Sequence, residues 1–218
     1  MKKLVIDLGH GGYDSGAVGK NGTKESDVVL SIGKYLNSML KESNLDFRFT
    51  RLSDKHLSLE DRVKFANDFE ADYFLSIHIN SCNDNTVRGV ESWQYNNNDE
   101  NLNAFSSNLC KDISSAFNIR NRGVKYSKNL YVLKNTSMKS VLIEVDFISN
   151  IFCENDLNDE ENIKKIATII NNNILKLYDL KENKKVYKVC VGAYNSKDNA
   201  YNILNILKNK GFNDAYIL

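Results

Sequence analysis

The segment KKLVIDLGHGGYDSGAVGK, residues 2–20, joins a short apolar run to a glycine-rich loop and places His10 at their junction. This pattern is typical of a buried strand that ends in a tight turn. Glycine-rich loops that follow a strand often bind phosphate, but this loop matches neither the dinucleotide-binding motif nor the P-loop motif. Asp14 occupies the third glycine position of the dinucleotide motif, and no lysine follows Gly16 as a P-loop requires. We therefore expect the histidine to carry the chemistry and the glycines to shape the loop around it.

Strand-like and helix-like segments alternate along the rest of the chain, which predicts an α/β fold. We expect an open, mostly parallel or mixed twisted sheet flanked by helices. Strands are expected at residues 3–8, 46–50, 72–80, 89–95, 129–135 and 140–147, and helices at 25–40, 58–69, 102–117 and 162–178.

A charged run, DLKENKK, separates this pattern from a short tail. The predicted boundaries are a main domain at residues 1–178, a linker at 179–185 and a small βαβ unit at 186–218. Segments of this size rarely bury enough apolar surface to fold unaided. We expect the tail to pack on the main domain or to pair with a second copy of itself in a homodimer.

The composition limits the kinds of partner. The 218 residues include 29 Lys+Arg and 28 Asp+Glu, a balance that predicts no nucleic-acid partner. No segment is long and apolar enough to span a bilayer, so no membrane insertion is expected. Near the N-terminus Asp7 interrupts the apolar run, which argues against a signal peptide. The expectation is synthesis in the cytoplasm without an export signal.

Four polar residues stand where a catalytic metal site would need them. His10 and His78 follow apolar runs at expected strand ends, where sites collect in open α/β sheets. Glu144 closes the apolar run SVLIE, and Glu25 begins the first expected helix. Two histidines and one carboxylate form a typical catalytic zinc ligand set, and a second carboxylate is then needed as general base. Periodicity alone leaves open which glutamate is the ligand and which is the base.

Five segments resemble, in order, the sequence blocks of the zinc-dependent N-acetylmuramoyl-L-alanine amidases, the family called amidase type 3. They are IDLGHGGYDSGAVG, a glutamate shortly after it, TRLSDKHLSLEDRVKFAN, ADYFLSIHINS and VLIEVDFISN. The resemblance implies that residues 1–178 form a catalytic zinc amidase domain. Its activity would be cleavage of the amide bond between N-acetylmuramic acid and L-alanine in peptidoglycan.

The resemblance also assigns roles to single residues. It implies that His10, Glu25 and His78 bind one zinc ion per chain, that Glu144 is the catalytic base and that Asn80 orients the substrate or its loop. One position departs from the family pattern. Asp146 stands where a small residue, commonly glycine, is usual, which raises the question of how substrate fits beside Glu144.

The tail resembles the first half of a SPOR domain, a peptidoglycan-binding module. This implies that residues 186–218 form a cell-wall-binding or dimerisation unit. Without an expected export signal, the chain is interpreted as a phage or prophage endolysin that reaches the wall after holin action or cell lysis. The alternatives are a sporulation mother-cell autolysin with the same activity, a different zinc peptidase and a non-catalytic wall-binding protein. The last is disfavoured because all four site positions are filled.

Overall fold

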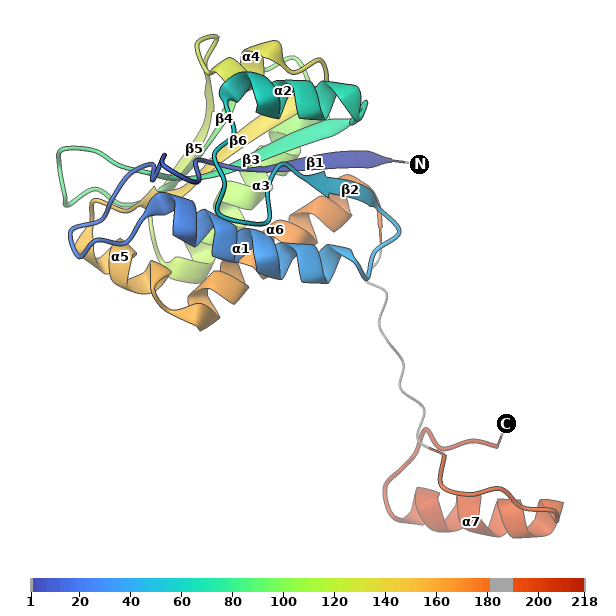
Figure 1. Ribbon diagram of the computed structural model, residues 1–218. Coiled ribbons are helices and arrows are strands. Elements are labelled where there is room, and N and C mark those ends of the chain that lie inside the picture. Colours follow the sequence, from blue (N-terminus) through green and yellow to red (C-terminus); the bar gives the residue numbers. More distant parts are fainter. Residues whose placement is uncertain (1, 181–189, 218) are drawn as a thin grey trace. The chain divides into compact units, whose positions relative to one another are not determined.

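The computed structural model describes residues 2–180 and 190–217 and divides into two compact units, Met1–Asn183 and Lys184–Leu218 (Figure 1). The first unit is built on a six-stranded sheet with the strand order β2-β1-β3-β6-β4-β5. Neighbouring strands are parallel except for β4 and β6, which are antiparallel. The expected open, mixed α/β sheet is confirmed. The strands are β1 (Lys3–Leu8), β2 (Asp46–Phe49), β3 (Tyr73–Asn80), β4 (Val90–Gln94), β5 (Asn121–Tyr126) and β6 (Lys139–Phe147).

Helices cover both faces of this sheet (Figure 1). Those of the first unit are α1 (Glu25–Leu40), α2 (Leu59–Asp68), α3 (Glu100–Phe117), α4 (Tyr131–Asn135), α5 (Ile151–Leu157) and α6 (Glu160–Leu177). The helix α2 begins at the expected capping box, in which Ser58 and Asp61 each accept from the other's backbone N–H. An apolar stripe must be buried to stabilise a helix, and the stripes of α1, α3 and α6 lie in one core with strands of the sheet.

The two faces of the sheet are covered to different extents. Leu75, Ile77 and Ile79 of β3 belong to a large core with α1, α3 and α6, whereas Phe74 packs in a smaller core with α2 and α4. Side chains alternate along a strand, so His78 lies on the same face as Phe74. The short helices α2 and α4 cover only part of that face. His78 at the end of β3 therefore stays partly exposed, with 18% of its side chain accessible.

The sequence interpretation was wrong in one part of the first unit. Residues 129–135 were expected to form a strand, but they contain the short helix α4, and the strand β5 lies before it. The β5 sequence NRGVKY has only Val124 and the exposed Tyr126 as apolar residues, too few for the alternation that marks a strand. Polar and charged side chains are common on edge strands, where they discourage pairing with other chains. The position of β5 at the sheet edge thus accounts for its weak signal.

The second unit contains one helix among its described residues 190–217, α7 (Lys197–Asn209). The first strand expected in the tail, residues 186–194, falls partly on residues 186–189, which lie outside the described residues. Its described end at 190–194, and residues 213–217 of the other expected strand, are not strands. Strands need hydrogen-bonded neighbours, and a lone pair is marginal in water, which explains the difference. No helix among the residues described in either unit is long and apolar enough to cross a membrane.

Candidate metal centre

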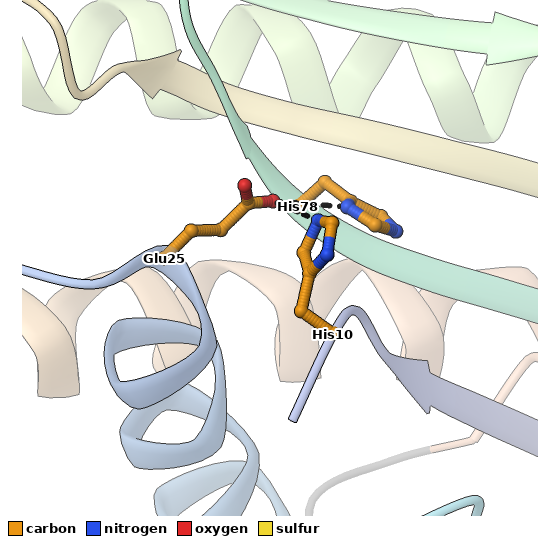
Figure 2. Close-up of side chains that lie close together, drawn as sticks. All are labelled: His10, Glu25 and His78. Carbon is orange, nitrogen blue, oxygen red and sulfur yellow. Dashed lines mark hydrogen bonds and ion pairs between the residues drawn. The ribbon is translucent and has the colours of Figure 1, made fainter. Parts of the chain in front are cut away.

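Three side chains from separate elements converge where β1 and β3 end (Figure 2). His10 lies just after β1, Glu25 is the first residue of α1 and His78 lies in β3. One potential ligand atom from each lies within 4.8 Å of the others. The glycine-rich loop makes this possible because it turns back on itself, and the Glu25 backbone N–H donates to the Ala17 carbonyl at 2.9 Å. The structure thus brings together the three residues that the sequence indicated as a ligand set.

Glu25 is the centre of this cluster. Its Oε1 lies 2.9 Å from Nδ1 of His78 and 3.2 Å from Nε2 of His10, and it accepts from the Ile79 backbone N–H at 3.0 Å. Its other oxygen accepts from the Ala17 N–H at 2.9 Å. Burial alone would raise the pKa of Glu25, but hydrogen bonds from the two histidines outweigh it and hold that pKa well below its usual range. Glu25 is therefore an ionised carboxylate facing two imidazoles.

Asp14 fixes the orientation of His10. The Asp14 carboxylate lies 2.9 Å from Nδ1 of His10, which directs Nε2 of His10 towards Glu25. A carboxylate on the far nitrogen of a ligating imidazole sets its tautomer and ring orientation. Burial acts to lower the pKa of His10, but Glu25 and Asp14 together raise it. Sequence reasoning missed this role of Asp14, although it had noticed a carboxylate where phosphate-binding loops carry glycine.

Two glycines leave room for the histidine rings. A Cβ at Gly9 would lie 2.3 Å from the ring of His78, and one at Gly16 would lie 2.5 Å from the ring of His10 and 2.6 Å from Oε2 of Glu25. Gly16 also has a φ of +64°, which side-chain-bearing residues rarely adopt. His10 itself has a φ of +60°, and strained backbone of this kind concentrates at functional sites.

Two buried arginines hold the strained backbone in place. Arg51 donates to the carbonyls of Leu8 at 3.0 Å and Gly9 at 2.7 Å. Arg62 donates to the carbonyls of Leu8 at 2.6 Å and His10 at 2.8 Å. Both side chains are almost completely inaccessible. Charge-assisted bonds to three successive carbonyls keep the loop in the conformation that presents His10.

Glu144 lies directly beside the cluster but in a different environment. In the β3–β6 ladder it is paired with His78, so both side chains project from the same face. Its Oε2 is buried and has no hydrogen-bond partner among the described residues. Burial raises the pKa of Glu144 well above its usual value, and the negative charges of Glu25 and Glu91 raise it further. A carboxylate with a raised pKa and a free oxygen is suited to accepting and returning a proton.

Asn80 is engaged by neighbours within the chain. Its Oδ1 accepts from the Ser81 N–H at 2.7 Å, and its Nδ2 donates to Oε1 of Glu91 at 3.1 Å. These contacts connect Asn80 to its own loop and to β4. The expected contact of Asn80 with substrate remains a prediction.

Asp146 has partners that account for its presence. Its Oδ1 accepts from the Gly89 N–H at 2.7 Å, and its Oδ2 is held by Arg88 at 2.7 and 2.9 Å. The β3–β6 register shifts between Glu144 and Phe147, as at a β-bulge. The Asp146 carboxylate therefore anchors the segment leading into β4, with both oxygens occupied.

The chemistry of the converging donors fits a zinc ion. Two imidazole nitrogens and one carboxylate oxygen are the ligand types of a three-residue catalytic site, which keeps a further position for water or substrate. The side chains of His10 and His78 are 25% and 18% exposed, so the site can be reached from solvent. The buried Glu144 oxygen lies on the same face, as a base acting on that position requires.

Comparisons with known proteins match both parts of the chain. The family model for N-acetylmuramoyl-L-alanine amidase matches residues 4–176, and that for the SPOR domain matches residues 156–218. The sporulation-specific N-acetylmuramoyl-L-alanine amidase of Bacillus subtilis is 33% identical over 222 residues, covering 100% of this chain and 85% of that protein. The endolysin of Bacillus phage SPP1 is 39% identical over 158 residues, covering 69% of this chain and 56% of that protein.

A solved structure shares the fold of the first unit. The catalytic domain of CwlV, an N-acetylmuramoyl-L-alanine amidase from Bacillus (Paenibacillus) polymyxa var. colistinus, superposes with a TM-score of 0.77 at 35% sequence identity. The match covers 83% of this chain and 100% of that domain.

Proposed function

Because the chain belongs to the N-acetylmuramoyl-L-alanine amidase family, we propose that it hydrolyses the amide bond between the lactyl group of N-acetylmuramic acid and L-alanine in peptidoglycan. The observation that carries the proposal is the convergence of His10, Glu25 and His78 beside the unpartnered oxygen of Glu144. All four residues lie within the part of the chain that the family model matches.

Zinc dependence is general in this family, and His10, Glu25 and His78 are the residues that would hold one Zn²⁺ per chain. When bound, the ion supplies a Lewis acid that polarises the scissile carbonyl and lowers the pKa of water towards about 7. Asp14 contributes by holding Nδ1 of His10, which leaves Nε2 free to bind metal.

Glu144 would move the proton in this reaction. It takes a proton from the attacking water and delivers it to the nitrogen of L-alanine as the amide bond breaks. Its raised pKa favours this exchange because the protonated form is readily reached at the buried site. Its Oε2 makes no competing hydrogen bond within the described chain, so it is available to water.

We also propose that the tail binds peptidoglycan, as its match to the SPOR domain supports. Among the described residues, α7 buries no side chain, and Tyr201, Ile206 and Phe212 are exposed. Aromatic side chains of this kind suit contact with sugar rings or with a second copy of the tail. Sedimentation of the full-length Tyr201→Ala variant with insoluble peptidoglycan tests wall binding, and its molar mass in solution tests the homodimer proposal.

Two biological settings are proposed for this activity. The endolysin setting is supported by the likeness of 69% of this chain to the phage SPP1 endolysin. The sporulation setting is supported by the B. subtilis amidase, because that match extends over the tail as well. Transcript levels after prophage induction and during sporulation would separate them, since each setting predicts a rise in one condition alone.

The test of the activity is digestion of purified peptidoglycan by the enzyme before and after chelation, followed by addition of zinc. We expect chelation to abolish activity and zinc to restore it. The products should show new L-alanine amino groups without new reducing sugars, which separates an amidase from a glycosidase. New amino groups on other residues would indicate a peptidase instead. Failure of zinc to restore activity would contradict the proposal.

A further inference from the structure

A buried carboxylate lies one strand beyond the proposed catalytic base. Glu144 of β6 is paired with His78 of β3 on one side and with Glu91 of β4 on the other. Residues paired in this way project from the same face of a sheet, so the three side chains form a row across it. Only 2% of Glu91 is exposed, and an unpaired charge at such a position would be strongly destabilising.

Two cations from the edge strand compensate this charge. Oε2 of Glu91 accepts from Nε of Arg122 at 2.8 Å and from Nζ of Lys125 at 2.6 Å, both in β5. Oε1 is occupied by Asn80 and by the Trp93 indole N–H at 3.2 Å. Burial would raise the pKa of Glu91, but Lys125 and Arg122 lower it below its usual value. Two cations facing one carboxylate leave one positive charge in excess.

The cations are held in place yet open to solvent. Their side chains are 26% exposed for Arg122 and 34% for Lys125. Arg122 packs 5.0 Å from the Phe147 ring centroid and Lys125 5.1 Å from that of Trp93. Arg122 uses only Nε for Glu91, and its two terminal nitrogens have no hydrogen-bond partner in the described part of the chain. These donors form the fork that binds a carboxylate with two parallel bonds.

We propose that Arg122 and Lys125 form a subsite for a free carboxylate on the stem peptide of peptidoglycan. The charged groups of Arg122 and Lys125 contact Glu91, so the position of Glu91 marks the subsite. Glu91 lies two strands from His78, which corresponds to about 10 Å at the usual strand spacing. An extended peptide spans this distance in about three residues. The carboxylate is thus expected on the second or third residue after the scissile amide. The inference rests on the proposed amidase function and adds a specificity for acidic stems.

The alternative is that the two cations only neutralise Glu91. A subsite and a purely structural pair differ in one measurable respect. The subsite distinguishes a substrate with a free carboxylate from its amide, whereas structural compensation affects both substrates alike.

The first experiment compares N-acetylmuramoyl-L-alanyl-D-glutamine, whose α-carboxylate is its one free carboxylate, with the same compound amidated at that carboxylate. We expect zinc-loaded wild-type enzyme to have a kcat/KM about tenfold higher for the acid, the effect of a charge-assisted bond at a partly exposed site. In Arg122→Gln this ratio should fall towards one, mainly through KM, and Arg122→Lys should restore part of it. Lys128→Gln is the matched control, because it removes an exposed positive charge just beyond β5 without touching Glu91.

The second experiment measures binding without turnover. Calorimetry with the zinc-loaded Glu144→Gln variant should show tighter binding of the acid than of the amide, and adding Arg122→Gln should remove the difference. Equal binding of the two compounds would overturn the subsite. So would an acid-to-amide ratio that is unchanged in Arg122→Gln. Failure of wild-type enzyme to cleave either compound or peptidoglycan would instead count against the amidase function, so the two failures are distinguishable.

Discussion

Glu25 and Glu144 are the same residue type at neighbouring positions of one site, but their surroundings are opposite. Glu25 has four donors on its two oxygens, including both histidines, and its pKa is lowered. Glu144 has a buried oxygen with no partner among the described residues and the negative charge of Glu25 nearby, and its pKa is raised. Partners, rather than residue type, therefore make one glutamate suited to holding a cation and the other suited to accepting a proton, which are the roles proposed for them.

This comparison is tested most directly by removing each charge in turn. Glu144→Gln should retain stoichiometric zinc but lose about 10²–10⁴-fold in kcat, because the base is removed while the ligands remain. Glu25→Gln should lose activity together with at least about 100-fold in zinc affinity. Metal analysis after dialysis, alongside turnover of peptidoglycan, measures both effects. Glu100→Gln removes an exposed glutamate as a control. The reverse pattern, with zinc lost from the Glu144 variant, would exchange the two roles.

The space around Glu25 can be tested with a matched pair of glycines. Gly16→Ala places a Cβ within 2.6 Å of Glu25 and His10, so we expect about 100-fold weaker zinc binding and a similar loss of activity. Gly22→Ala has a comparable positive φ in the same loop, but nothing lies within 4 Å of its added Cβ. It should cost about 1 kcal/mol of stability and leave zinc affinity intact. Equal zinc loss in both variants would show that backbone strain, and not ligand crowding, is responsible.

The environment of Glu144 can be tested through the pH profile of Glu91→Gln. As the proposed base, Glu144 must be ionised to act, so activity is expected to fall as the pH drops through its pKa. The negative charge of Glu91 contributes to raising that pKa. Its removal should shift the acid limb of kcat/KM to lower pH, by about one unit. A limb that stays in place or moves upward would show that Glu91 does not influence the base.

A third carboxylate, Glu154, extends the comparison to donors that are mainly backbone groups of one loop. Its oxygens accept from the N–H groups of Asn21 and Thr23 at 2.9–3.1 Å, which fixes the loop that leads to Glu25. Glu154→Gln turns an amide N–H₂ towards these donors, so we expect a decrease in Tm of about 2–4 °C at pH 7. A variant with unchanged Tm would show that the loop does not depend on Glu154.

The loss of stability in Glu154→Gln should also depend on pH, in a direction set by the pKa of Glu154. Burial would raise the pKa of Glu154, but hydrogen bonds from the loop backbone and from Thr23 lower it below its usual value. The stabilisation from the charged form is therefore complete above about pH 4.5 and is lost as the pH falls below it. Calorimetric scans should show the Tm difference between wild type and variant shrinking over that range. A Tm difference that grows as the pH falls would show that the pKa of Glu154 is not lowered by folding.

Much of this site could be predicted because its residues follow strong local signals. His10 and His78 end or follow apolar strands and Glu25 starts an amphipathic helix, and parallel strands bring their carboxyl ends to one edge. The division of roles between Glu25 and Glu144 needed the resemblance, because a pKa depends on partners distant in sequence. Glu91 was missed for the same reason, since its partners Arg122 and Lys125 lie more than 30 residues away in sequence.

The errors in the fold have a similar origin. The edge strand β5 carries no apolar alternation, whereas the apolar residues Val132 and Leu133 of α4 suggest a strand although they are buried by one helical turn. Local pattern identifies elements whose burial is periodic, and it fails where a short element is held by its neighbours.

The position of β6 has a consequence for how the protein is made. It is the last strand of the sheet to be synthesised, yet it lies in the middle, between β3 and β4. Until residue 147 has left the ribosome, β1–β3 and β4–β5 have no strand to join them, and Glu144, the proposed base, is not yet in place. The proposed activity therefore requires translation of the whole sheet. A chain released before Lys139 should remain unfolded by circular dichroism, because its two half-sheets lack their shared neighbour.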